Sequence, residues 1–314
     1  MKYCTKDKMN IGIDLGGSHI GIGLVDNNGK IVSKTDTEII VDKIEDIENY
    51  IIENIVANIY KLLDIKDIKL SEVGYIGIGV PGEPSNGVIK RMVNLGIQNF
   101  DIVGTLKKKL EYKNIGIRND GKCAGIAEKM YGSIKEYEDA VFLCIGSGIG
   151  GAVFINNKLL TPKRHSGFEI GHMVIKKDGN VCKCGNKGCF ETYCSIKYFR
   201  NKIISSTDNA NITSKNFLEF LSNNKDDESI KILIEEYLED LIIGLDNIVN
   251  IFEPEAITLG GGFSYFREVF FDRLQDKFNN ANGLYNKDNI PMLKLAVLGN
   301  DAGIIGASID RLEK

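Results

Sequence analysis

Three cysteines and one histidine have the types and the spacing of a metal site. Cys182, Cys184 and Cys189 fall within eight residues, and His172 precedes them by ten. One histidine with three thiolates is a standard closed ligand set for structural zinc. Buried free thiols are the alternative, and we favour the metal because thiols crowded together in a reducing compartment indicate metal binding before a disulfide. The other cysteines are scattered and are predicted to be ordinary residues: Cys4, Cys123, Cys144 and Cys194.

A first glycine-rich segment, IDLGGSHIGIGLV, has the composition of a phosphate-binding turn. Gly16 and Gly17 would let backbone N–H groups approach phosphate oxygens, and Asp14 at the end of a strand could hold a hydrated Mg²⁺. The next two residues, Ser18 and His19, complete the turn. The segment is no P-loop, because no Gly-Lys-Ser/Thr follows, and no dinucleotide fingerprint, because a strand follows it. A plain β-hairpin turn is the alternative.

Two further glycine clusters have related patterns. Residues Gly146, Ser147, Gly148 and Gly150 again lie between two β-type runs, and two such hairpins could clamp a triphosphate from both sides. The third cluster, Gly260, Gly261 and Gly262, lies at a strand-to-helix junction, where a flat ring could lie against the bare backbone. In isolation, a tight turn explains the third cluster about as well. The likeness of the first two hairpins indicates duplicated halves.

A carboxylate with a possible chemical role follows a short strand at residues 115–117. Asp120 could act as a general base on a hydroxyl, with Asn119 beside it. The competing explanation is structural, because Asn and Asp are favoured residues at a helix N-cap.

The elements that must position these residues alternate between strands and helices. Apolar periodicity predicts helices over 44–63, 121–131, 228–252, 264–278 and 301–313, and strands over 73–80, 115–117, 256–259 and 293–297. The polar segment 205–228 is expected to be a surface excursion. This alternation predicts an α/β fold with mixed sheets.

The bulk composition is that of an ordinary globular protein and excludes several classes. The 314 residues are 43% hydrophobic and 26% charged, with a formal net charge of -4, which disfavours a nucleic-acid-binding protein. We expect no membrane partner, because no apolar run has the length of a membrane span. The polar N-terminus lacks the apolar segment of a signal peptide, so a cytoplasmic location is expected.

Taken in order, the motifs resemble the ROK family (repressors, open reading frames, kinases) of the actin–Hsp70–hexokinase superfamily. The segments that carry the resemblance include IGIDLGGSHIGIGLVD, GIGVPGEPSNGVI, IRNDGKCAGIAE, CIGSGIGGAVFINNKL, FEIGHMVI, CKCGNKGCFETYCS and FEPEAITLGGG. The resemblance implies a two-lobed actin-like (ribonuclease H-like) α/β fold with a cleft between the lobes. The expected lobes are residues 1–118, with the helix 301–314 packing back on them, and residues 119–300 with the zinc loop.

The resemblance also implies an ATP-dependent sugar kinase in which ATP and Mg²⁺ lie against the glycine motifs. By the family pattern, Asp120 would be the base that takes the proton from the sugar hydroxyl. The other hydroxyls would be bound by Asn94, Asn119, Glu169, His172 and Glu191. His172 would use one ring nitrogen for zinc and the other for the sugar, since a metal on one nitrogen fixes the tautomer of the other. Family members are usually homodimers or homotetramers.

The chain departs from the family pattern near both substrates. The usual Gly-Gly-Thr-Lys is Gly-Gly-Ser18-His19, which keeps a hydroxyl and loses a fixed positive charge. Phe168 replaces a glycine that often precedes the Glu, and Ile97 stands near a position where glucose-specific members often carry Trp. These changes leave the effect on nucleotide and sugar preference open.

Glucose is the expected acceptor, because it is the commonest one in the family. N-acetylmannosamine, N-acetylglucosamine and fructose kinases are the alternatives within the kinases. A sugar-responsive transcriptional regulator of the ROK type is the alternative of another class. It is disfavoured because only ten residues precede Ile11, too few for a helix-turn-helix domain, and because Asn119 and Asp120 are intact.

Overall fold

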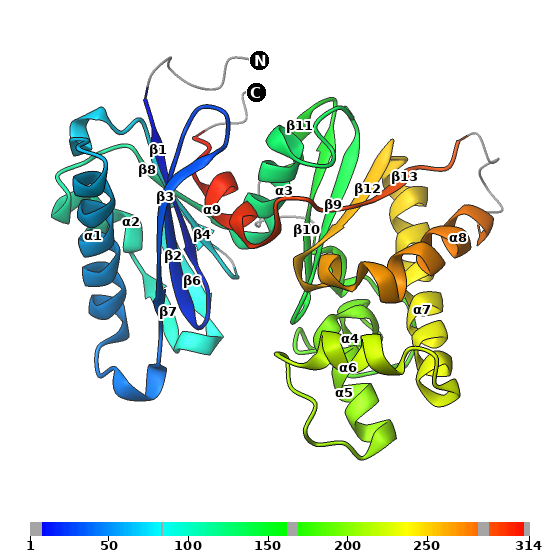
Figure 1. Ribbon diagram of the computed structural model, residues 1–314. Coiled ribbons are helices and arrows are strands. Elements are labelled where there is room, and N and C mark those ends of the chain that lie inside the picture. Colours follow the sequence, from blue (N-terminus) through cyan, green and yellow to red (C-terminus); the bar gives the residue numbers. More distant parts are fainter. Residues whose placement is uncertain (1–7, 83, 162–168, 282–288, 311–314) are drawn as a thin grey trace. The chain divides into compact units, whose positions relative to one another are not determined.

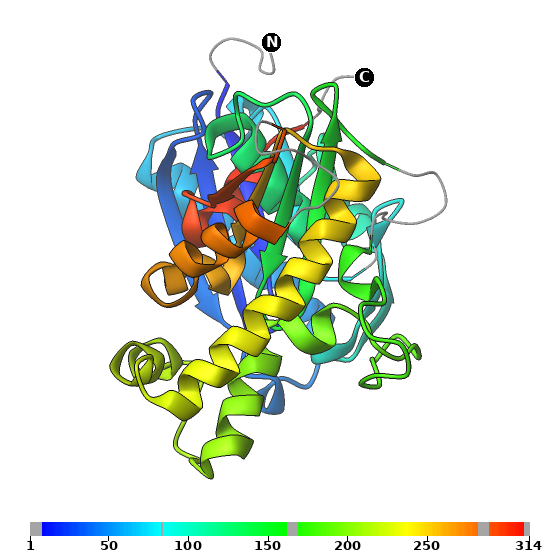
Figure 2. The same cartoon turned by 90° about the vertical axis from the view of Figure 1, so that its right-hand side faces the viewer.

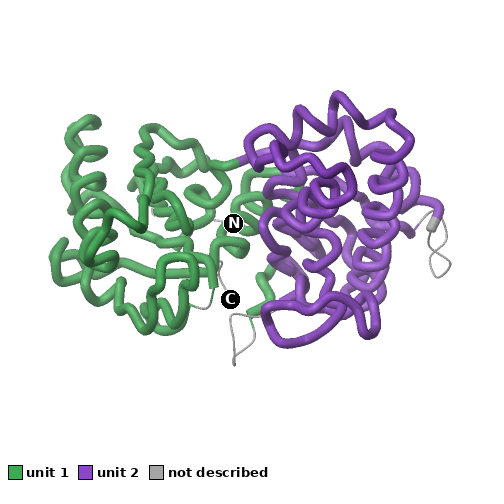
Figure 3. The backbone as a smooth tube through the Cα atoms, turned by 90° about the horizontal axis from the view of Figure 1, so that it is seen from below, with its two compact units in different colours: residues 1–135, 158–167, 300–314 green, residues 136–157, 168–299 purple. Residues whose placement is uncertain are grey.

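The computed structural model describes residues 8–82, 84–161, 169–281 and 289–310. The chain divides into two compact units, which Figure 3 distinguishes by colour. Unit 1 comprises residues 1–135, 158–167 and 300–314, and unit 2 comprises residues 136–157 and 168–299. The boundary expected after residue 118 therefore lies after residue 135, because helix α3 (Asp120–Tyr131) packs against helix α9 (Ala302–Ala307) within unit 1.

The first sheet has five strands in the order β3-β2-β1-β4-β8 (Figure 1). Its strands are β1 (Asn10–Leu15), β2 (His19–Val25), β3 (Ile31–Glu38), β4 (Ile76–Val80) and β8 (Ile115–Asn119). The strands β1, β2 and β3 form antiparallel hairpins, whereas β1, β4 and β8 run parallel. Parallel strands end at the same edge of a sheet, so the residues after β1, β4 and β8 lie at one edge.

Alternation of isoleucine and glycine gives this sheet two different faces. On one face Ile11 and Ile13 are fully buried in the core that α1 (Ile47–Ile65) covers. On the other face α9 lies so close that a carbon added at Gly12 would be 1.8 Å from the Ile304 carbonyl oxygen. The Arg118 guanidinium donates to the carbonyl oxygens of Ile309 and Asp310, and these bonds hold the residues after α9 against β8.

A small second layer completes unit 1. The three strands β5 (Pro84–Ser85), β6 (Val88–Met92) and β7 (Ile97–Phe100) form a separate sheet in that order. Helix α2 (Ile102–Lys109) packs against α1, β6 and β8. Short 3-10 turns occupy the connections Val41–Lys43 (η1), Leu70–Glu72 (η2), Val93–Leu95 (η3) and, near the C-terminus, Gly299–Asp301 (η7).

The second sheet repeats the topology of the first, in the order β11-β10-β9-β12-β13. Its strands are β9 (Ala140–Ile145), β10 (Ile149–Ile155), β11 (Lys158–Leu159), β12 (Ala256–Gly260) and β13 (Met292–Leu295). As in the first sheet, the first strand pairs antiparallel with the next one and parallel with a later one. The duplication that the two glycine hairpins predicted is confirmed.

The helices of unit 2 enclose an aromatic core. The long helix α7 (Glu228–Phe252), prominent in Figure 2, packs against α4 (Glu191–Cys194), α5 (Ile196–Thr207) and α8 (Asp272–Ala281). The rings of Phe199 and Tyr237 lie 4.5 Å apart, and Phe270 lies 5.2 Å from Tyr237. Unit 2 also contains α6 (Phe217–Asn224), the 3-10 helices Ile170–His172 (η4) and Gly261–Phe266 (η5), and the π-helical Arg267–Phe271 (η6).

Several predicted elements differ from the observed ones for identifiable reasons. The helix expected over 44–63 begins at Ile47, because the Asp46 carboxylate accepts a hydrogen bond from the Asn49 N–H and caps it. The segment 205–228 is not a simple surface excursion, since α6 buries Phe217 and Leu221. The helix expected over 264–278 is divided into η5, η6 and α8, and α9 is shorter than the expected 301–313.

Candidate functional site

The carboxyl edge of the first sheet gathers the acidic residues that the sequence singled out. In strand register Asp14 pairs with Gly79, Gly79 pairs with Arg118, and Asn119 follows directly. Asp14 on β1 and Asp120 directly after β8 therefore flank the end of β4, and the charge of Asp14 raises the pKa of Asp120.

The structure separates the roles of Asn119 and Asp120. Asn119 is the N-cap of α3, because its side-chain oxygen accepts from the Lys122 N–H at 3.2 Å and its amide donates to the Gly82 carbonyl oxygen. Asp120 is the first helical residue, and its carboxylate accepts from the N–H of the next residue, Gly121, at 2.7 Å. Burial is the main cause of the raised pKa of Asp120. The helix cap thus accounts for Asn119 and leaves Asp120 available for chemistry.

The turn between β1 and β2 brings together five predicted residues of unit 1. The Gly16 N–H donates to the His19 carbonyl oxygen at 2.9 Å, and Ser18 is exposed between them. A carbon added at Gly17 would be 2.9 Å from the side-chain nitrogen of Asn94, so the Asn94 side chain lies directly against this turn.

His19 is oriented toward Asp14 across the same turn. Its Nε2 lies 3.8 Å from the Asp14 carboxylate, and the interaction with Asp14 raises the pKa of His19. The departure from the family lysine therefore places an imidazole beside the carboxylate that was predicted to hold Mg²⁺.

The second glycine turn lies at a pocket of unit 2. The Gly146 N–H donates to the Gly148 carbonyl oxygen, and the Lys197 N–H at the start of α5 donates to the Gly146 carbonyl oxygen. A pocket of about 570 Å³ opens beside this turn. It is lined by Gly146, Ser147, Ile196, Lys197, Arg200, Ser214, Lys215, Phe217, Leu218, Gly262, Tyr265 and Phe266.

The pocket joins the second and third glycine motifs, but only partly as expected. Gly262 lines it, whereas Gly260 and Gly261 pack against the end of β9, where a carbon added at Gly260 would be 2.7 Å from the Phe142 ring. Gly150 lies within β10 and does not line the pocket.

The cationic and apolar residues that line this pocket were not predicted from the sequence. Lys197 and Arg200 lie one turn apart on α5, directly after the cysteine-rich loop, and this helical spacing was a usable signal. Lys215 and Leu218 fall in the segment that was expected to be a surface excursion. Their place at the pocket follows from the packing of α6, which local sequence does not reveal.

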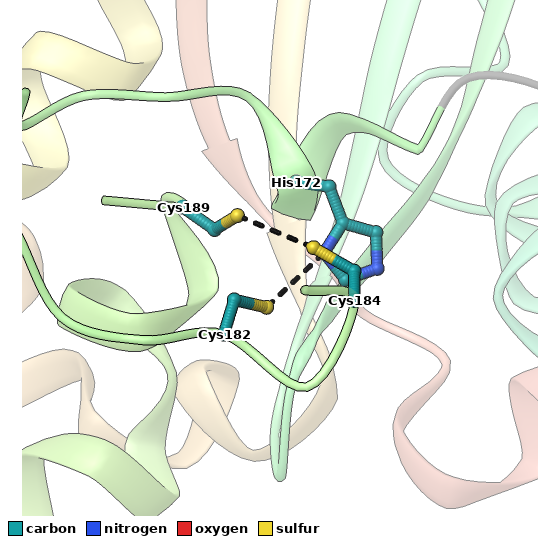
Figure 4. A group of neighbouring side chains, drawn as sticks. All are labelled: His172, Cys182, Cys184 and Cys189. Atoms are coloured by element: carbon teal, nitrogen blue, oxygen red, sulfur yellow. Dashed lines mark hydrogen bonds between the residues drawn. The ribbon is translucent and has the colours of Figure 1, made fainter. Parts of the chain in front are cut away.

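The predicted metal ligands form one cluster in unit 2 (Figure 4). The donor atoms of His172, Cys182, Cys184 and Cys189 all lie within 4.8 Å of one another. The Cys182 sulfur is 3.5 Å from His172 Nδ1, and the Cys184 and Cys189 sulfurs are 3.6 Å apart. Tetrahedral zinc would separate sulfur from nitrogen by about 3.5 Å and two sulfurs by about 3.8 Å, so the donor set fits that ion.

The loop that carries these ligands is braced from several sides. The Cys182 N–H donates to the Asn186 carbonyl oxygen at 2.8 Å, and a bridge joins Val174 to Cys189. Gly188 has a φ of +78°, and a carbon added there would be 1.7 Å from the Lys176 carbonyl oxygen, so glycine is required.

The remaining predicted sugar-binding residues of unit 2 adjoin the cluster. One carboxylate oxygen of Glu191 lies 3.2 Å from the Cys182 sulfur and 3.7 Å from His172 Nδ1. A carbon added at Gly148 would be 2.7 Å from the other oxygen, so Glu191 lies between the cluster and the second glycine turn. Glu169 is exposed at the start of η4, and Phe168 lies outside the described residues.

The predicted site residues thus form two groups, one in each unit. Unit 1 holds Asp14, Gly16, Gly17, Ser18, His19, Asn94, Asn119 and Asp120. Unit 2 holds Gly146, Ser147, Gly148, Gly150, Glu169, His172, Cys182, Cys184, Cys189, Glu191, Gly260, Gly261 and Gly262. Among the described helices, none combines the length and the apolar character needed to cross a lipid bilayer.

The duplicated sheets and their paired glycine turns define a two-lobed α/β protein of the actin-like class. The chain belongs to the ROK family, whose model matches residues 10–310. It is 29% identical to a glucokinase of Thermotoga maritima over 95% of both chains. It is also 27% identical to a xylose repressor of Caldicellulosiruptor bescii, covering 94% of this chain and 76% of the repressor.

Solved structures confirm the predicted fold class. A ROK family glucokinase from Streptomyces griseus, in complex with glucose and AMPPNP, superposes with a TM-score of 0.76 at 24% identity, covering 96% of this chain and 98% of that one. A ROK family transcriptional regulator, a homologue of the Escherichia coli Mlc protein, superposes with a TM-score of 0.82 at 19% identity. The match covers 97% of this chain and 78% of the regulator. At these identities the likeness establishes the shared fold.

Proposed function

We propose that this ROK protein is an ATP-dependent sugar kinase in which Asp120 is the general base. The observation that carries the proposal is the state of Asp120: its carboxylate has a raised pKa and no capping role. A sugar hydroxyl is a very weak acid, so it needs a positioned acceptor as it attacks the terminal phosphate. A carboxylate whose pKa is raised is a stronger acceptor for that proton.

The nucleotide is assigned to the glycine turns and to the pocket of unit 2. The pocket of about 570 Å³ has the size of a nucleotide site, and apolar walls beside Gly146 and Ser147 suit a flat base next to phosphate. Asp14, with Gly16 and Gly17, is assigned to the Mg²⁺ and phosphate end. Bound Mg²⁺ would neutralise the charge that develops on the phosphates during transfer. Ser18 would replace the family threonine as a hydroxyl donor.

Zinc is proposed as the structural ion of the His172 and cysteine cluster. With Nδ1 on the metal, the other ring nitrogen of His172 would carry the proton and could donate to a sugar hydroxyl. Glu191 lies against the same cluster, so a rigid loop would position both residues. Asn94, Asn119 and Glu169 are assigned to the remaining hydroxyls.

Glucose is the proposed acceptor, on the grounds that relatives over nearly the whole chain are named glucokinases. N-acetylglucosamine is the first alternative, because kinases of that name from Histophilus somni and Pasteurella multocida are 25% and 24% identical. N-acetylmannosamine and fructose remain in the substrate panel. A cytoplasmic location is proposed because the described cysteines outside the cluster are free thiols, as in a reducing compartment.

The test is a coupled ADP-release assay with purified protein, Mg²⁺ATP and a panel of hexoses and N-acetylhexosamines. Sugar-dependent ADP release that is fastest with glucose is the expected result. Fast release with another sugar would change the acceptor and keep the class. ADP release that no sugar stimulates would refute the kinase.

A transcriptional regulator is the second candidate, because the chain also matches xylose repressors and a ROK regulator. The two functions separate in a gel-shift assay with DNA from the upstream region of the gene. We expect no retardation at micromolar protein. Specific retardation that a sugar relieves, together with an absence of ADP release, would favour the regulator.

A further inference from the structure

The pocket of unit 2 contains an unusual set of polar groups. Three cationic side chains line it, those of Lys197, Arg200 and Lys215. Within the described ranges, no residue forms an ion pair or a side-chain hydrogen bond with any of the three. Lys197 and Lys215 are exposed to water, whereas Arg200 is half-buried, so a ligand in the pocket could supply acceptors to its guanidinium.

The walls of the pocket suit the flat face of a base. The side chain of Tyr265 is 51% exposed and that of Leu218 is 36% exposed, although both are large apolar groups at the pocket. A planar ring that covers them would remove this apolar surface from water. The edge of that ring would then meet the polar groups.

The side chains at the pocket offer donors in excess of acceptors. Among the described lining residues there is no aspartate, glutamate, asparagine or glutamine, so no carboxylate or carboxamide oxygen faces the ligand. Lysine and arginine only donate, and hydroxyl groups such as that of Ser147 can do either. The 6-amino group of adenine needs an acceptor, whereas the O6 and N7 atoms of guanine or hypoxanthine accept two bonds from one guanidinium.

On the basis of the proposed kinase function, we infer that this pocket accepts 6-oxopurine nucleotides as phosphoryl donors at least as well as ATP, with Arg200 reading O6 and N7. GTP and ITP are the donors concerned. The reaction is otherwise unchanged: the bond from the terminal phosphorus to the bridging oxygen breaks, a bond to the sugar oxygen forms, and the hydroxyl proton goes to Asp120. Nucleoside diphosphate is the leaving group.

The competing explanation is that the three cations bind the phosphates of the donor. In that case they would raise affinity for every nucleotide and for inorganic tripolyphosphate alike, and the base would be irrelevant. The ratio of kcat/KM for GTP to kcat/KM for ATP separates the two explanations, because the phosphates cancel in that ratio.

The decisive variant is Arg200→Gln, since glutamine pairs with N6 and N7 of adenine as arginine pairs with O6 and N7 of guanine. We expect a wild-type ratio of 1 or above, and a fall of about tenfold or more in Arg200→Gln, the discrimination typical of one bidentate contact. The matched control is Lys202→Gln, which removes a cation from the same helix. The Lys202 side chain pairs with Glu236 and does not line the pocket. The control should leave the ratio unchanged.

The measurements are steady-state kinetics with ATP, GTP and ITP, and calorimetric binding of each nucleotide without sugar. A wild-type kcat/KM that is higher for ATP than for GTP and ITP would overturn the inference, as would an Arg200→Gln variant that weakens all donors equally. Sugar phosphorylation with ATP as the only effective donor would refute this inference and would still support the proposed kinase function. If no sugar is phosphorylated, the kinase fails, and calorimetry still decides the base preference of the pocket.

Discussion

Replacing Asp120 by asparagine separates the base from every structural role of this position. The change keeps the size of the side chain, and an amide oxygen can still accept the 2.7 Å bond from the Gly121 N–H. The cap of α3 is untouched, because Asn119 supplies it. The change removes the negative charge and, with it, the ability to take a proton.

The expected loss is in turnover. Removing a general base lowers the rate by about 100-fold or more, or about 2.7 kcal/mol of transition-state stabilisation. KM for ATP should change little, because the nucleotide is assigned to the glycine turns and the pocket of unit 2. The acid limb of the wild-type kcat/KM profile should lie above the ordinary aspartate range, since burial raises the pKa of Asp120 and activity is lost as pH falls through it.

Stability should move in the opposite direction from activity. The folded pKa of Asp120 is raised above its unfolded value, so the ionised carboxylate disfavours the folded state at neutral pH and this cost disappears as pH falls. Asp120→Asn removes that cost, and its melting temperature at pH 7 should equal or exceed that of the wild type. A helix-capping role predicts a normal turnover instead.

The assay is thermal melting together with steady-state kinetics across pH. The matched control is Asp101→Asn, since Asp101 caps α2 by accepting from the Gly104 N–H and asparagine caps about as well. The control should keep both the melting temperature and the turnover. Near-normal turnover in a folded Asp120→Asn protein would mean that the base is another residue.

Three further expectations concern metal, packing and assembly. The purified protein should contain about one zinc per chain by elemental analysis, and Cys184→Ser should lower both zinc content and melting temperature; zinc-free fresh protein would refute the site. In Gly306→Ala the added carbon would be 1.7 Å from the Cys123 carbonyl oxygen, so the free energy of unfolding, measured by urea denaturation, should fall by about 3 kcal/mol. Gly150→Ala meets nothing within 4 Å and should not change stability. Sedimentation should show a homodimer or homotetramer at micromolar concentration, and a monomer would contradict it.

Local patterns predicted the elements whose signals are self-contained. The helix over 228–252 has the bounds that its apolar period indicated, and Asp227 caps it by accepting from the Ser229 N–H. Both glycine hairpins form as their alternation predicted. In contrast, η5 and η6 replace the first half of the helix expected over 264–278, and the rings of Phe266 and Phe270 stack on each other within this segment.

The family, the duplicated hairpins and the grouping of His172 with Cys182, Cys184 and Cys189 were predicted from the sequence alone, because short-range spacing and residue chemistry carry them. Tertiary structure decided which of Asn119 and Asp120 caps the helix, since the two have nearly equal cap propensity and only the backbone geometry distinguishes them. It also brought Lys215, which precedes α6, and Leu218 on α6 to the pocket beside Gly146, which lies about seventy positions away in the chain. Burial and the nearby charge of Asp14, both long-range effects, raise the pKa of Asp120, and neither can be derived from the residue and its neighbours in the chain.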